Sequence, residues 1–130
     1  MTEAALASCP AIKACTLSYV TVQSQSELEE FCRHIARAPV IGFDTEFVSE
    51  DTFHPELCLI QVAADDTLAV IDPYELEDLT PFWTLLAEGQ HTTIVHAARE
   101  ELNFSLRSID RGPANLFDTQ LASAFCSHQY

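Results

Sequence analysis

Residues 41–73 have the sequence IGFDTEFVSEDTFHPELCLIQVAADDTLAVIDP, in which apolar runs alternate with short polar turns. Such runs, rich in β-branched and aromatic residues, are typical of strands and occur at 40–47 (VIGFDTEF), 57–64 (LCLIQVAA) and 68–71. The turn Asp65-Asp66 predicts that the last two strands form a hairpin. The nearly continuous apolar character of 57–64 predicts a strand that is buried on both faces.

Helices and shorter strands are predicted on either side of this segment. In chain order they are a strand at 17–22, a helix from a capping box of Ser26 and Glu29 to Ala38, a helix begun by Thr80 with Pro81 at its first position, a strand at 93–96, a helix at 97–108, an extended piece at 116–117, and a helix capped by Asp118 or Thr119 that covers 121–126. This order predicts the α/β class, with a mixed β-sheet flanked by helices.

Composition limits the classes of protein that the chain can belong to. It has 130 residues, with 20 acidic against 6 basic side chains and a formal charge of −14. The hydrophobic share of 48% argues against a disordered acidic tail. No apolar run approaches the roughly 18 residues that span a bilayer, so we expect no membrane partner. Five cysteines without C-x-x-C spacing favour neither zinc nor disulfides and fit a cytoplasmic protein.

The domain organisation expected from these patterns is simple. Residues 1–16 have no clear period and are interpreted as a loose leader, without the basic start of a secretory signal. Residues 17–130 form one domain.

Two carboxylates in the strand at 40–47 are the first candidate site. Side chains alternate along a strand, so Asp44 and Glu46 share one face with Gly42. At a rise of about 3.3 Å per residue they lie about 6–7 Å apart, and their long side chains can converge on one divalent cation or hold two. The alternative is an edge strand with a solvated face, and this strand alone does not decide between the two.

A second group follows the strand at 93–96, in the sequence HAAREEL. On a helical wheel, Ala98, Leu102, Ser105, Leu106 and Ile109 form an apolar stripe. Glu101 lies beside this stripe and is predicted to point inward, whereas Glu100 points to solvent. His96 ends a strand, where it could be a ligand or a structural donor. Three carboxylates with oxygen donors alone suit Mg²⁺ or Mn²⁺ better than zinc.

These motifs resemble ribonuclease D and its relatives, the DEDD 3′–5′ exonucleases. The resemblance lies in IGFDTEF, the HPELCLIQ strand, the IDP turn, VHAAREELNFSL and LFDTQLASAF, in the family's order. It implies a ribonuclease H-like fold, two divalent cations (Mg²⁺ or Mn²⁺), no organic cofactor, and stepwise release of nucleoside monophosphates from a nucleic-acid 3′ end. By position it assigns the catalytic and metal-binding roles to Asp44, Glu46 and Glu101, and substrate contacts to Thr45, Phe47 and His96.

The chain departs from the family pattern in two places. Glu101 stands where the family usually has an aspartate, and its extra methylene moves the carboxylate by about 1.5 Å. The family's third motif, Y-x-x-x-D or H-x-x-x-D, lies downstream of the second, and the sequence ends at Tyr130 before reaching it. We therefore expect the nuclease domain to be incomplete at its C-terminus, and this piece alone to be weakly active or inactive. For Phe47 a place in the core explains the residue as well as a substrate contact does, and for Asp118 helix capping is sufficient.

Three hypotheses about function remain open at this point. The first is a metal-dependent 3′–5′ exonuclease of RNA processing, with weak affinity for long RNA because few basic residues are present. The second is a non-catalytic ribonuclease H-like fragment or module that binds a partner. The third is a DNA-directed exonuclease of the same superfamily, since RNA rather than DNA is indicated by the resemblance alone.

Overall fold

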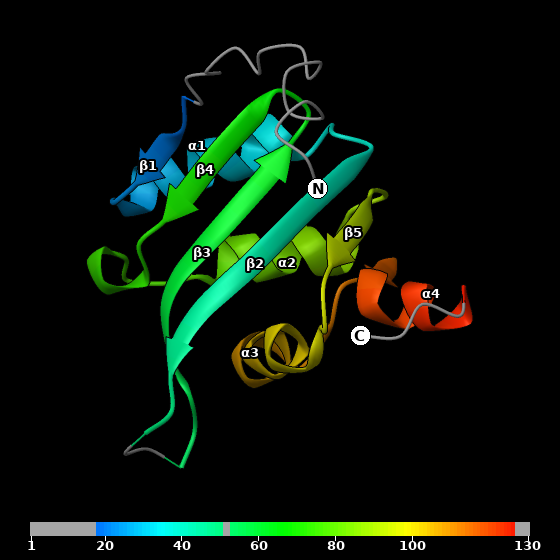
Figure 1. Ribbon diagram of the computed structural model, residues 1–130. Coiled ribbons are helices and arrows are strands. Elements are labelled where there is room, and N and C mark those ends of the chain that lie inside the picture. Colours follow the sequence, from blue (N-terminus) through cyan, green and yellow to red (C-terminus); the bar gives the residue numbers. More distant parts are fainter. Residues whose placement is uncertain (1–17, 51–52, 127–130) are drawn as a thin grey trace, which may run out of the picture.

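The computed structural model describes residues 18–50 and 53–126, which form a sheet with helices on one face (Figure 1). The elements are β1 (Val20–Val22), α1 (Gln25–Ile35), β2 (Val40–Val48), β3 (Glu56–Ala64), β4 (Thr67–Ile71), a 3₁₀ turn η2 (Pro73–Glu75), α2 (Thr80–Glu88), β5 (Thr92–Val95), α3 (Arg99–Ile109), β6 (Leu116–Asp118) and α4 (Thr119–Phe125). The predicted order of strands and helices is confirmed. Residues 1–16, interpreted as a leader, lie outside the described residues.

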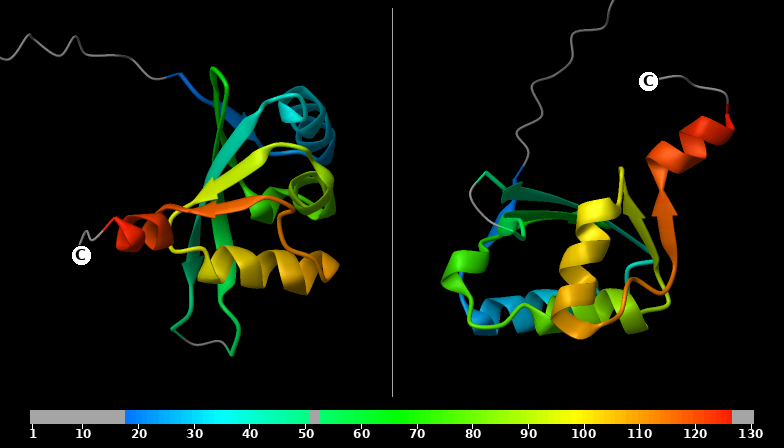
Figure 2. Two further views of the ribbon diagram at one scale, coloured as in Figure 1. Left: turned by 90° about the vertical axis from the view of Figure 1, so that its right-hand side faces the viewer. Right: turned by 90° about the horizontal axis from the view of Figure 1, so that it is seen from below.

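The sheet is mixed, as the sequence predicts. Its strand order is β1-β4-β3-β2-β5-β6. The segment quoted first forms the antiparallel centre β2-β3-β4, and β1, β5 and β6 add in parallel outside it. The helices α1, α2 and α3 lie along one face of this sheet, and α4 projects beyond β6 (Figure 2). Among the described residues, none of the helices has the length and apolar character needed to cross a membrane.

The hydrophobic core lies between the sheet and the three helices. Phe43 on β2 packs edge-on against Phe82 and Trp83 of α2, with ring centroids 5.7 Å and 6.0 Å apart. Alternate residues are buried in this layer over part of each central strand, at 41, 43 and 45 of β2 and at 60, 62 and 64 of β3. Burying a large apolar side chain contributes about 1.5–3 kcal/mol, so this face supplies most of the stabilisation.

The opposite face of the sheet is open in the part of the chain that the structure describes. Gln61 and Ala63 of β3 are exposed there, so the prediction that 57–64 is buried on both faces is wrong. On that face the polar Gln61 is followed by the apolar Ala63, so a single polar side chain marks it within 57–64. Composition alone therefore suggested burial where the strand has one solvated face.

The start of α1 lies two residues earlier than the capping box proposed from sequence. Ser24 is the N-cap, and its Oγ accepts a hydrogen bond from the Glu27 N–H at 3.3 Å. Glu27 Oε2 in turn accepts from the Gln23 N–H at 2.9 Å. Both Ser24 and Ser26 could cap by composition, but only Ser24 lies where the chain turns into the helix. The helix ends at Ile35, before the predicted Ala38.

The start of α2 also differs from the prediction. Thr80 is the first helical residue, Leu79 occupies the N-cap position, and no side chain caps the helix there. Instead Asp78 Oδ1 accepts from the Thr80 N–H at 2.8 Å. Pro81 lies in the first turn, where its missing N–H is not needed.

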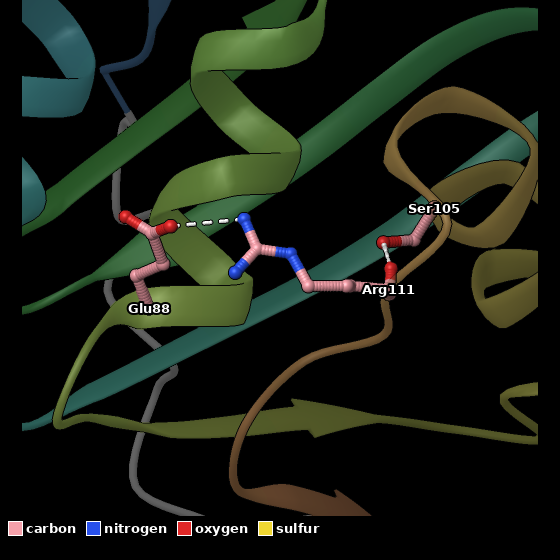
Figure 3. A network of polar contacts seen from close by, with 3 residues as sticks. All are labelled: Glu88, Ser105 and Arg111. Carbon is pink, nitrogen blue, oxygen red and sulfur yellow. Dashed lines mark hydrogen bonds and ion pairs between the residues drawn. The ribbon is translucent and has the colours of Figure 1, made fainter.

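The C-terminal end of α3 is tied to its surroundings by the segment that follows it (Figure 3). Ser105 Oγ, which is fully buried, donates to the Arg111 carbonyl at 2.6 Å. The Arg111 guanidinium forms an ion pair with Glu88 of α2 at 2.9 Å. The helix ends at Ile109, and its C-cap Asp110 has a left-handed φ of 56°. These contacts fix the position of α3 relative to α2, and α3 carries Glu101 in its first turn.

Candidate active site

Asp44 and Glu46 project from the open face of β2. Both side chains are exposed, and they alternate with the buried Phe43 and Thr45. On the neighbouring strand they lie opposite Gln61 and Leu59. A shallow hollow of about 410 Å³ lies beside Asp44, over strands β2, β3 and β4. The two carboxylates therefore share one solvated surface, as strand periodicity predicts.

A bulge interrupts the ladder where this carboxylate pair ends. Glu46 pairs with Leu59 but Phe47 pairs with Leu57, so Cys58 is an extra residue on β3. Cys58 Sγ lies 3.3 Å from the hydroxyl of Tyr74. Bulges bend strands and are common beside active sites, because they change the direction of side chains. The sequence does not predict this bulge. One extra residue changes the pairing of β3 with β2 but leaves the amino-acid composition of β3 typical of a regular strand.

Glu101 lies on the other side of β2. Its side chain is 6% exposed, and its Oε1 accepts a hydrogen bond from Thr45 Oγ1 at 2.7 Å. Thr45, also 6% exposed, alternates with Asp44 and Glu46 along the strand and so faces the helices. The prediction that Glu101 points inward is confirmed. The structure does not, however, bring its carboxylate onto the surface that Asp44 and Glu46 share.

The buried residues of α3 differ from the apolar stripe predicted on the helical wheel. Leu106 is 46% exposed, whereas Phe104 is buried together with Glu101 and Ser105. The helix begins at Arg99, after a left-handed Ala97 with a φ of 59°. Phe104 contacts Phe47 of β2, so the buried side of the helix includes Phe104 in place of Leu106.

Phe47 lies on the helix-covered face, near the end of β2. Its ring packs edge-on against Phe104, with centroids 5.8 Å apart, and 37% of the residue is exposed. Arg107 Cζ lies 5.0 Å from the centre of the Phe104 ring. This packing supports the core explanation of Phe47, and its contact with substrate stays a prediction.

His96 is exposed at the end of β5 and lies beside Thr119 of α4. Its Nδ1 is 2.9 Å from Thr119 Oγ1, and that hydroxyl donates to the Val95 carbonyl at 3.2 Å. Either atom of the contact between His96 and Thr119 can be the donor, depending on the tautomer of the imidazole ring. The structure thus gives His96 a structural contact with α4, and its contact with substrate stays a prediction.

Asp118 holds together the two turns beside His96. Its Oδ1 accepts from the N–H groups of Ala97, Gln120 and Leu121, and its Oδ2 accepts from Ala98. The predicted cap of α4 is confirmed, while the bonds to the turn between β5 and α3 were not foreseen. The backbone N–H of Ala98 is the main cause that lowers the pKa of the Asp118 carboxyl, and the other three N–H groups add to it.

The sequence model of a protein family described as 3′–5′ exonuclease matches residues 19–130. The chain belongs to this family. It is 34% identical to ribonuclease D of Escherichia coli over 110 residues, which are 85% of this chain and 29% of that protein. The crystal structure of the same enzyme superposes with a TM-score of 0.80, over 87% of this chain and 30% of that one. The domain therefore has the ribonuclease H-like exonuclease fold.

Two more distant structures share the fold of this exonuclease domain. Trypanosoma brucei ribonuclease D in complex with RNA U12 is 17% identical, with a TM-score of 0.68 over 78% of this chain and 37% of that one. The EXD2 exonuclease domain soaked in Mg and GMP is 20% identical, with a TM-score of 0.62 over 85% and 63% of the two chains. The chain spans about 30% of the length of the curated relatives that it matches first.

The donor atoms of the exonuclease domain fit only part of a site for divalent cations. Asp44 and Glu46 present hard oxygen donors on one exposed surface, which suits Mg²⁺ or Mn²⁺. Within residues 18–50 and 53–126, however, no three histidine, cysteine, aspartate or glutamate side chains gather closely enough to hold a metal ion. These residues by themselves do not form the cation site that the family resemblance implies.

Proposed function

We propose that the protein is a metal-dependent 3′–5′ exonuclease that acts on RNA and releases nucleoside monophosphates. The single observation that carries the proposal is the exposed pair Asp44 and Glu46, two residues apart on the open face of β2, within a domain of the 3′–5′ exonuclease family. RNA is favoured because the curated relatives are ribonucleases D and because one structural relative was crystallised with RNA.

Cations are required in this proposal for an electrostatic reason. Asp44, Glu46 and a phosphodiester are all anionic, and the chain carries a formal charge of −14. Two like charges 4 Å apart repel by about 4 kcal/mol at an effective dielectric constant near 20. A divalent cation between the carboxylates and the phosphate turns this repulsion into attraction. We propose Mg²⁺ or Mn²⁺ for this role, and a complete site needs oxygen donors beyond these two.

The role of the protein residues follows from their surroundings. The antiparallel pairing of Asp44 with Gln61 and of Glu46 with Leu59 holds both backbone positions rigidly, on the side away from the hydrophobic core. The hollow beside Asp44 leaves room for a nucleotide chain on the same surface. Placing catalytic carboxylates on a central strand gives them a fixed separation, which catalysis by positioning requires.

A non-catalytic module that binds a partner is the second candidate. It is favoured by the absence, among the described residues, of a third donor near Asp44 and Glu46. In that case the open face of the sheet would bind a partner instead of a nucleic acid.

The two candidates are separated by an exonuclease assay on the full-length gene product with 5′-labelled RNA, and with DNA of the same sequence. The proposal expects shortening from the 3′ end that needs Mn²⁺ or Mg²⁺, and loss of turnover in Asp44→Asn. The matched control is Asp66→Asn, which makes the same charge change at an exposed residue of the β3–β4 turn. Retained turnover in Asp44→Asn removes Asp44 from the mechanism, and shortening of DNA alone assigns the other polymer.

A further inference from the structure

We infer that a groove between helix α3 and the connection from β2 to β3 binds one unpaired base of single-stranded RNA, stacked on Phe53, with the adjoining phosphate at Arg107. This contact belongs to the proposed function, on which the inference rests, because it holds the same RNA strand at a second place. The groove has a volume of about 480 Å³, within the roughly 300–1,000 Å³ of small-ligand sites. Its lining consists of residues 53–55 on one side, and of Glu100, Asn103, Leu106 and Arg107 on the other.

Phe53 presents an aromatic ring to solvent in this groove. It is 96% exposed, more than any other large hydrophobic residue in the part of the chain that the structure describes. Its ring meets that of His54 in an edge-to-face arrangement, with centroids 4.8 Å apart. A ring this exposed has room for a nucleobase on its face. Stacking of a base on an aromatic side chain contributes about 1–3 kcal/mol, judged by alanine substitution.

Arg107 supplies the positive charge of the groove. Its Cζ lies 5.0 Å from the centre of the buried Phe104 ring, and such a cation–π contact keeps the guanidinium in place. Within residues 18–50 and 53–126, Arg107 forms no ion pair, so its charge is available to a phosphate. Glu100 lies two helical turns earlier, about 10.5 Å away along the axis. The phosphate is therefore expected at the Arg107 end of the groove, away from this carboxylate.

The groove lies beside the strand that carries the carboxylate pair. Phe53 is on the connection that follows β2, and α3 packs on the same strand through Phe104, whose ring centroid is 5.8 Å from that of Phe47. An RNA strand whose 3′ end lies at Asp44 and Glu46 can therefore continue past the end of β2 into the groove. The two contacts then hold one strand at separate nucleotides.

Single-stranded RNA is the occupant that fits the chemistry of this groove. The chain has six basic residues and a formal charge of −14, so it cannot hold a nucleic acid by charge alone. Stacking needs no basic surface, and it tolerates any sequence because every base has a π-face. Such tolerance suits an exonuclease, which meets each base of its substrate in turn. In a duplex the faces of the bases are already stacked on one another, so duplex RNA does not offer a base to Phe53.

Substitutions at positions 53 and 107 separate stacking from the other properties of the groove. F53L keeps an apolar side chain but removes the π-system, F53A removes both, and F53W keeps a ring that stacks and fluoresces. R107A removes the charge, and its matched control is R37A, at an exposed arginine outside the groove. Trp83 is the only tryptophan of the sequence and is 1% exposed, so the wild type supplies the fluorescence background for F53W.

The first measurement is tryptophan fluorescence of the full-length gene product carrying F53W, titrated with single-stranded oligo(A) RNA. EDTA is present, so that divalent cations and turnover do not contribute. Single-stranded RNA should quench the fluorescence of F53W well beyond the change seen in the wild type, and a blunt duplex containing the same strand should not. Absence of quenching, or equal quenching by the duplex, would overturn the inference.

The second measurement is the affinity of the variants for labelled oligo(A) in EDTA, by fluorescence anisotropy, with folding checked by circular dichroism. F53A and F53L should each weaken binding by about fivefold or more. R107A should lower the slope of the logarithm of affinity against the logarithm of salt concentration by about 0.7, the effect of one lost phosphate contact, and R37A should leave this slope unchanged. Wild-type affinity in F53L would overturn the inference, since the groove would then recognise an apolar surface such as that of a protein partner.

An unchanged salt slope in R107A would also overturn the inference, because the phosphate would then lie elsewhere. The proposed function is tested separately, by adding Mn²⁺ to the same wild-type protein and RNA. If the RNA is bound but not shortened from its 3′ end, the proposed function fails while binding in the groove stands. If the RNA is shortened but F53W shows no quenching, the groove fails while the proposed function stands.

Discussion

The four backbone bonds accepted by Asp118 allow a quantitative test of how the candidate site is supported. Asp118 joins the N-terminus of α4 to the turn from β5 into α3, which carries His96 at its start and Glu101 shortly after it. Asp118→Ala removes all four acceptor contacts and leaves the backbone elsewhere unchanged. We therefore expect the variant to loosen two turns at once, although Asp118 has no place in the core.

The expected magnitude follows from the number and type of these bonds. Loss of an aspartate N-cap costs about 1 kcal/mol of the free energy of unfolding. The two bonds to Ala97 and Ala98 contribute about 1 kcal/mol each. Asp118→Ala should thus lower the free energy of unfolding by about 3 kcal/mol, a large part of the 5–15 kcal/mol that is typical of a domain.

Asp118→Asn is the matched control, because it keeps Oδ1 and replaces only Oδ2. The amide oxygen can still accept from Ala97, Gln120 and Leu121, while the new NH₂ group cannot accept from Ala98. The expected loss is about 1–2 kcal/mol. Because asparagine does not titrate, the pH dependence of the stability difference between wild type and Asp118→Asn reports the titration of Asp118.

The dependence on pH follows from the lowered pKa of Asp118 in the folded state. A carboxyl with a depressed pKa contributes stability that is complete above its unfolded value of about 3.9, and loses it as pH falls through the folded value. The difference between wild type and Asp118→Asn should therefore be constant at neutral pH and shrink below about pH 4. Urea unfolding at pH 7 and at successively lower pH measures both effects. A loss below about 0.5 kcal/mol for Asp118→Ala at pH 7 would refute the reasoning, because it would mean that water replaces all four bonds at no cost.

Three further predictions concern residues outside the candidate site. His91 is buried, neither of its ring nitrogens has a hydrogen-bond partner among the described residues, and burial lowers its pKa. His91→Leu should therefore raise the free energy of unfolding, measured in urea, by about 1 kcal/mol. The gain should be larger below about pH 6.5, because there the unfolded histidine takes up a proton that the folded one resists. Equal or lower stability of that variant at pH 5.5 would contradict this. Ser105→Ala should lower the free energy of unfolding by about 1 kcal/mol, since it leaves the Arg111 carbonyl without its buried donor. Arg111→Ala should lower it by less than about 0.5 kcal/mol, because the ion pair of Arg111 with Glu88 is solvated. A larger loss in Arg111→Ala than in Ser105→Ala would show that the ion pair, not the hydroxyl, holds this segment in place. Burial, with the charge of Glu29 as a smaller cause, raises the pKa of Cys32 to about 11, so iodoacetamide at pH 8 should leave Cys32 unmodified in the native protein and label it in urea, as peptide mass spectrometry can show.

The sequence was sufficient wherever a structural feature depends on a short local pattern. The alternation of residues in β2 placed Asp44 and Glu46 on one face, and the turn at Asp65-Asp66 joined β3 to β4. The predicted helix starts were wrong by one or two residues, because Ser24, Ser26, Asp78 and Thr80 are all residues that can cap. Which of them meets a free backbone N–H is decided by the path of the chain into the helix. The open face of β3 was missed for a similar reason, since burial is a property of neighbouring layers.

The position of Glu101 shows where local patterns stop being informative. A helical wheel correctly turned its side chain inward, but inward from α3 means towards the face of β2 that carries Thr45, and the wheel contains no information about that strand. The threonine hydroxyl completes the arrangement by providing a donor at 2.7 Å. An aspartate at position 101 would be shorter by about 1.5 Å and would lose this bond unless α3 moved closer to β2. Thr45 and Glu101 therefore form a pair matched in length, and the departure of position 101 from the family's aspartate has a physical consequence in the packing of α3 against the strand that carries the carboxylates.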